Sequence, residues 1–208
     1  MAVRYSQTQL IQEAKAKLAL LEEDILYFLE RDPKLFHKDF LINLKNAICI
    51  AEELQNLDDT WNATQAQHAQ QVAHHIQHGR QLYSQLKKTL QGRTHPFPFT
   101  HYRKAISSQE RFCLFLEAIS HILATRQAEL IQWGFAASQQ QAFQQATLAL
   151  RQALQARTRT QAQYAEQFAR RKTAQGQLRH ALEQIRRTGQ SIHRHKNPDR
   201  YQQYLLSY

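Results

Sequence analysis

The chain has few residues that interrupt helices: it contains 5 glycines and 4 prolines among 208 residues. Glutamine is abundant, with 31 copies, and alanine, leucine and arginine are also common. These side chains lose little rotamer freedom in a helix, and no stretch shows the alternation of a half-buried strand. The sequence therefore predicts an all-α fold, an elongated antiparallel helical bundle of about four to six helices, some of them very long.

Cysteine is almost absent. Cys49 and Cys113 stand alone, which excludes a disulfide framework and a cysteine-type zinc site, and two isolated thiols suit a reducing compartment. No run approaches the roughly 20 apolar residues of a membrane-spanning helix, and no secretory signal pattern opens the chain. We therefore expect a cytoplasmic protein with no membrane partner.

Motifs that carry catalysis are also missing. The chain has no glycine-rich phosphate loop, no nucleophile elbow and no HExxH pattern. His74, His75 and His78 share part of one predicted helix, but no carboxylate or cysteine accompanies them, so solvated histidines are favoured over a metal site. We expect a non-enzymatic protein without a cofactor or bound metal.

The hydrophobic periodicity predicts where the helices begin and end. A first helix covers about residues 6–31 and stops at Asp32-Pro33, and a second runs from about residue 36 to residue 90, with a possible division at residues 56–62. Ser107 and Glu110 predict a capping box, Gly134 a break and Gly189 the end of the last long helix. The predicted organisation is an acidic to neutral helical unit at residues 1–92, a Pro/aromatic linker at 93–106, a basic helical unit at 107–190 and a basic tail at 191–208.

Charge is sorted along the chain. The net charge is −4 over residues 1–60, +5 over residues 61–150 and +9 over residues 151–208. Such a one-sign region attracts polyanions, such as nucleic acid, an acidic peptide or an anionic membrane. The residues predicted to bind such a polyanion belong to the last long helix: Arg170, Arg171, Lys172, Arg179, Arg186 and Arg187.

Arg126 interrupts an apolar stripe between Ile122 and Leu130. Either its stem packs while the guanidinium reaches solvent, or it is an arginine among apolar groups that grips a carboxylate. Rings and cations also alternate from Phe97 to Lys104, which suits stacking on bases, clasping a peptide or docking on the core.

These features together resemble the primosomal replication protein PriC family over about residues 10–155. The residues that carry the resemblance are Leu35-Phe36 after an aspartate, residues 48–52, Gln71-Val72-Ala73 leading to Gln81-Leu82, and residues 112–116. The chain departs from the family where Cys113-Leu114-Phe115 replaces a pair of arginines, and it extends beyond the usual C-terminus.

The resemblance implies an adaptor for replication restart. Such a protein binds single-stranded or forked DNA and the acidic tail of the single-stranded-DNA-binding protein, and assists loading of the replicative helicase. Arg111, Phe112 and Arg126 are the residues expected to hold the tail, and the six cations of the last long helix named above are the predicted DNA-binding residues. The alternative is a helical scaffold, with glutamine-rich seams at Gln65 and Gln161, or a protein that binds membrane surfaces through a basic face.

Overall fold

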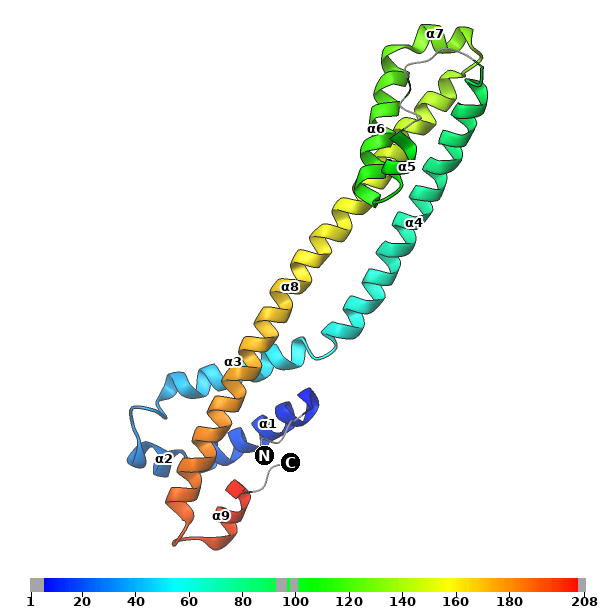
Figure 1. Ribbon diagram of the computed structural model, residues 1–208. Coiled ribbons are helices and arrows are strands. Elements are labelled where there is room, and N and C mark those ends of the chain that lie inside the picture. The colour runs from blue at the N-terminus through cyan, green and yellow to red at the C-terminus, as the bar shows by residue number, and fades with distance from the viewer. Residues whose placement is uncertain (1–5, 93–96, 98–100, 206–208) are drawn as a thin grey trace. The chain divides into compact units, whose positions relative to one another are not determined.

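The computed structural model describes residues 6–92, 97 and 101–205, and its regular structure there is entirely helical (Figure 1). The all-α prediction is confirmed, as is the expectation of very long helices, because α4 and α8 contain 33 and 57 residues. The helices are α1 (Gln7–Glu23), α2 (Ile25–Arg31), α3 (Lys38–Glu53), α4 (Leu57–Thr89), α5 (Tyr102–Ala105), α6 (Gln109–Thr125), α7 (Gln127–Gln132), α8 (Ala137–His193) and α9 (Pro198–Leu205).

The chain forms two compact units. Residues 1–60 and 163–208 make one, which we call the terminal unit, and residues 61–162 make the other, the central unit. This division differs from the predicted one, whose boundary lay at residues 93–106. Leu86 before that segment and Leu116 after it are buried in the same core, because α4 and α6 pack together within the central unit.

The predicted linker is only partly described. Residues 93–96 and 98–100 lie outside the described part of the chain, whereas Phe97 is buried in the central core. Tyr102–Ala105 forms the short helix α5, whose Ala105 is also buried. The described residues of this segment are therefore part of the central unit and do not form a spacer between domains.

The terminal unit is built from both ends of the sequence. Its apolar core takes Leu10 and Leu21 from α1, Leu44 from α3, and Leu178 and Ile185 from α8. Helix α1 begins with a capping box, in which the Ser6 hydroxyl accepts from the Gln9 backbone N–H and the Gln9 side chain accepts from the Ser6 N–H. The predicted first helix is divided at Asp24, between α1 and α2.

The prediction that Gly189 ends the last long helix is wrong. Helix α8 continues through Gly189 to His193, and Pro198 then starts α9. A Cβ atom added to Gly189 would lie 2.4 Å from the Tyr204 ring, which is fully buried. This glycine is therefore explained by the close approach of α9.

The central unit contains α5, α6, α7 and the adjoining parts of α4 and α8. Its core is rich in aromatic rings, including Tyr83, Phe112, Phe115 and Phe143. Helices α6 and α8 run antiparallel, as shown by the Glu117–Arg151 ion pair and the Gln109–Arg157 hydrogen bond.

The structure corrects one predicted feature of this unit, the capping box, and confirms another, the break at Gly134. The N-cap of α6 is Ser108, whose hydroxyl accepts from the Arg111 N–H, so the Ser107–Glu110 capping box is wrong by one residue. Gly134 adopts φ +85°, a left-handed conformation that ends α7 before α8 begins, as predicted.

Within the described ranges, no helix combines the length and apolar character needed to cross a membrane.

Candidate functional site

A groove between α5 and α6 combines apolar surface with cations. Its cavity volume is about 500 Å³. Figure 1 shows α5 lying against α6 within the central unit. The residues that line this α5/α6 groove are His101, Lys104, Ala105, Arg111, Leu114, Phe115 and Ala118.

Local hydrogen bonds fix the end of the groove where Arg111 lies. The Ser107 hydroxyl donates to the Lys104 carbonyl at 2.7 Å and accepts from Nη1 of Arg111 at 3.1 Å. Because Ser108 caps α6, Arg111 is held in the first turn of the helix. The turn between α5 and α6 thus places Lys104 and Arg111 on one groove.

A layer of aromatic rings supports the groove from inside. Tyr102 of α5 stacks on Tyr83 of α4, with ring centres 4.3 Å apart and planes 8° apart. Phe115 meets both tyrosine rings, at 5.4 Å from Tyr83 and 5.8 Å from Tyr102. Burial raises the pKa of the Tyr83 hydroxyl, and the neighbouring Tyr102 adds to this effect. The layer holds the four-residue helix α5 in place.

The structure does not bring the three predicted peptide-binding residues together. Arg111 is exposed and lines the α5/α6 groove, whereas Phe112 is buried in the central core with 1 % exposure. Arg126 is the C-cap of α6, 15 residues from Arg111 and so about 22 Å away at 1.5 Å per residue. Its Nη1 lies 3.3 Å from a Glu129 carboxylate oxygen. Arg111 is thus the one member of the three that lines this groove.

Some of the six predicted DNA-binding residues have internal partners. Arg171 is buried and donates from both terminal nitrogens to the Asp58 carboxylate, each at 3.0 Å. Arg186 donates to the fully buried Glu13 at 2.9 Å. Arg187 pairs with Glu183 one turn earlier on α8. Arg170, Lys172 and Arg179 are exposed and form no ion pair within the described part of the chain.

Folding redistributes the charge that is sorted along the sequence. The terminal unit joins the acidic N-terminal segment to the basic C-terminal one, and it contains 16 Lys/Arg and 14 Asp/Glu, a net charge of +2. The central unit contains 11 Lys/Arg and only 3 Asp/Glu, a net charge of +8. Most of the positive excess of the protein therefore belongs to the central unit.

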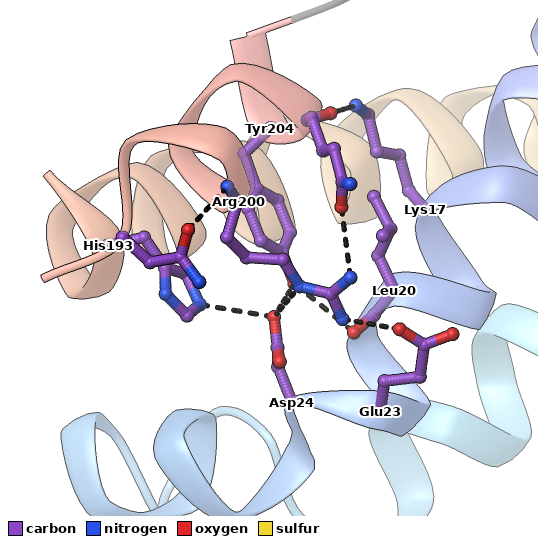
Figure 2. Close-up of polar contacts among 9 residues, drawn as sticks. Lys17, Leu20, Glu23, Asp24, His193, Arg200 and Tyr204 are labelled. Carbon is purple, nitrogen blue, oxygen red and sulfur yellow. Dashed lines mark hydrogen bonds and ion pairs between the residues drawn. The ribbon is translucent and has the colours of Figure 1, made fainter.

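Asp24 shows how closely the terminal unit pairs its charges (Figure 2). One of its oxygens accepts from Nε of Arg200 at 2.8 Å and from the Tyr204 hydroxyl at 2.8 Å, and lies 3.1 Å from Nε2 of His193. Burial alone would raise the pKa of Asp24, but the bonds from Arg200 and Tyr204 outweigh it and hold the pKa below its usual value. Arg200 also donates to Glu23 and Gln203, so its three nitrogens are occupied. This network fastens α9 to α1 and α2.

His74, His75 and His78, three of the four histidines of α4, are not arranged as a metal site. The pKa of His75 is lowered by its burial and by its neighbours His74 and His78. Across residues 6–92, 97 and 101–205, no group of three or more histidine, cysteine, aspartate or glutamate side chains is arranged to hold a metal ion.

One signal for the charged surface was present in the sequence but is easily missed. No aspartate or glutamate occurs from residue 60 to residue 109, a stretch that contains six Lys/Arg and six His. The density of cations is lower there than in the C-terminal run, so a count of positive charges alone overlooks it. The absence of acids is what distinguishes the segment.

Comparison with protein-family models, with curated proteins and with solved structures gives no match for this chain.

Proposed function

We propose that the protein is a non-enzymatic adaptor of DNA-replication restart. It binds the acidic C-terminal tail of the single-stranded-DNA-binding protein and single-stranded DNA, and it assists loading of the replicative helicase. The observation that carries this proposal is the α5/α6 groove, where cations border an exposed apolar surface.

The chemistry of the groove matches an acidic peptide that ends in an apolar residue. Arg111 and Lys104 supply charge for carboxylates, and an arginine can bind a carboxylate through two parallel hydrogen bonds. Leu114, Phe115 and Ala118 supply an apolar surface for a ring. None of the described lining residues is acidic, so nothing in the lining repels such a tail.

Leu114 gives the groove an apolar contact that the fold itself does not use. It is 62 % exposed although it lies on α6 between the buried Cys113 and Phe115. A large apolar side chain exposed beside cations is typical of a binding surface. We therefore place the terminal aromatic ring of the tail against Leu114.

The charge of the central unit supports the second ligand. A net charge of +8 on 102 residues favours the approach of a nucleic acid, and added salt weakens this attraction. The peptide and the nucleic acid are both anionic, so the same unit can attract each of them.

Fluorescence anisotropy with a labelled acidic peptide ending in Pro-Phe tests this proposal. We expect Arg111→Ala to weaken binding at least about tenfold, because a charge-assisted contact at a carboxylate is lost. Leu114→Ser should weaken binding without a change of charge. Arg126→Ala is the matched control, since it removes an arginine from the same helix outside the groove.

Two results would contradict the proposal. The first is that Arg126→Ala lowers the affinity for the peptide as much as Arg111→Ala does. The second is the absence of peptide binding at about 200 mM salt together with co-sedimentation of the protein with anionic vesicles, which would favour the membrane-surface alternative.

A further inference from the structure

We infer that the phosphates of a nucleic acid bind to the central unit, at a cluster of five cations around the α4, α5 and α6 aromatic layer. This inference rests on the proposed function, since it takes nucleic acid as the partner. It assigns the contact to residues other than those of the C-terminal basic run. The members of this cationic cluster are Arg80, Lys87, Arg103, Lys104 and Arg111.

Arg80 contacts the aromatic layer, and the other four cations lie within four residues of one of its rings along the chain. The guanidinium carbon of Arg80 lies 6.0 Å from the centre of the Phe112 ring, and Phe112 directly follows Arg111. Tyr83 stacks on Tyr102, which directly precedes Arg103 and Lys104. Lys87 and Arg80 lie four and three residues from Tyr83, so both flank it on the same face of α4.

All five cations lie at the surface. Each belongs to an exposed residue, and none forms an ion pair within the described ranges. The acid closest to them in sequence is Glu110, because residues 60–109 contain no aspartate or glutamate. A surface that serves only solubility usually mixes the two signs of charge. The cationic cluster is instead nearly uniform, as expected of a phosphate-binding surface.

Three of the six predicted residues of the C-terminal run lack these properties, whereas Arg170, Lys172 and Arg179 share them. Arg171 and Arg186 are held by Asp58 and Glu13, and Arg187 by Glu183. The unit that contains this run is nearly neutral, at +2, whereas the unit that contains the cationic cluster carries +8.

The burial of the rings indicates how the nucleic acid is recognised. Tyr83, Phe112 and Phe115 are buried and Tyr102 is half-buried, so their faces are occupied by one another. The surface therefore offers charge to phosphates and little ring surface to bases. Binding should depend weakly on base sequence and strongly on salt.

Two triple variants of equal charge test the inference. One combines Arg80→Gln, Lys87→Gln and Arg103→Gln, which leaves the α5/α6 groove intact. The matched control combines Arg170→Gln, Lys172→Gln and Arg179→Gln on α8. Binding of labelled oligo(dT) is measured by anisotropy from about 50 to 200 mM salt, and the folding of both variants is compared by thermal unfolding.

We expect the first variant to lose at least about tenfold in affinity at low salt. Its slope of log affinity against log salt should become shallower by about 2, because three phosphate contacts to a single strand are lost. The control variant should stay within about threefold of the wild-type protein.

Two other results would overturn the inference, and they differ in what they say of the proposed function. An equal or larger loss in the control variant would place the contact on α8 and leave the proposed function standing. Failure of the wild-type protein to bind the oligonucleotide at about 50 mM salt would overturn both.

Discussion

The guanidinium of Arg171 meets the carboxylate of Asp58 through two parallel hydrogen bonds of 3.0 Å, and the Tyr164 hydroxyl donates to the same carboxylate at 2.9 Å. The bonds from Arg171 and Tyr164 lower the pKa of Asp58. Asp58 lies in the first turn of α4, and Arg171 is a buried residue of α8. The pair therefore fixes the start of α4 against α8 within the terminal unit.

Replacing Asp58 by alanine leaves the buried guanidinium of Arg171 without its partner. We expect the free energy of unfolding to fall by about 1–3 kcal/mol, as for other lost hydrogen bonds to a charged group. Asp59→Ala is the control, because Asp59 is the exposed neighbour in the same turn. Chemical denaturation measures both, and equal losses in the two variants would show that the Arg171 contact adds nothing.

Two glycines of α8 should respond in opposite directions to alanine. A Cβ at Gly189 would meet the Tyr204 ring at 2.4 Å, so Gly189→Ala should lower the free energy of unfolding by about 1–3 kcal/mol. A Cβ at Gly176 meets nothing within 4 Å, so Gly176→Ala should raise it by about 0.5–1 kcal/mol through helix propensity. Thermal unfolding of the two variants compares them directly, and stabilisation by both would mean that α9 does not pack against Gly189.

Asp24 predicts a loss of stability in acid. Its pKa is lower in the folded protein than in the unfolded chain, so the folded state favours the charged form. The stabilisation is complete above the unfolded value of about 3.9, and it is lost as the pH falls through the folded pKa. The stability advantage of the wild-type protein over Asp24→Asn should therefore be constant above about pH 5 and shrink below about pH 4. Urea titrations at several pH values measure it, and an advantage that grows in acid would contradict the assignment.

The two cysteines should differ in reactivity. Cys49 is exposed, whereas Cys113 is buried and its pKa is raised to about 11, mainly by burial and also by Glu117. Since the thiolate is the reactive form, Cys49 should react with a disulfide reagent at pH 8, and Cys113 should react only after denaturation. Cys49→Ser should remove the fast reaction, and a fast reaction that persists in this variant would show that Cys113 is accessible.

The acidic peptide and the nucleic acid should compete. Lys104 and Arg111 belong both to the α5/α6 groove and to the cationic cluster, so one ligand occupies charge that the other needs. A saturating peptide should raise the apparent dissociation constant of oligo(dT) at least about threefold. A peptide with its acids replaced by amides is the control, and unchanged oligonucleotide affinity with the acidic peptide would mean that the two surfaces are separate.

The fold class and much of the helical pattern could be predicted from the sequence. Scarce glycine and proline and the apolar periodicity are local properties, and they predicted the long helices and the break at Gly134. Hydrophobic periodicity identifies the buried face of a helix but not the helix that covers it. For this reason the packing of α9 on Gly189, and the pairing of Arg171 with Asp58, could not be predicted.

The candidate site was predicted only in part. Arg111 was predicted through the family resemblance, and it lines the α5/α6 groove. Phe112 was named with it, but a ring on an apolar stripe is equally suited to a core, and here it belongs to one. In the basic run on α8, acids more than 100 residues away along the chain pair with Arg171 and Arg186, and this pairing could not be predicted from the local sequence.

The division of the chain into a terminal and a central unit also sets an order for folding during synthesis. The central unit is one continuous segment, residues 61–162, so its core needs no part of the chain that is synthesised later. Residues 1–60 emerge first but lack the α8 and α9 side chains that complete their core until residues 163–208 have followed. At about 5–20 residues per second, the intervening 102 residues delay that meeting by roughly 5–20 seconds. During this interval the acidic segment is a nascent chain with an uncovered apolar face, which is the state that chaperones recognise.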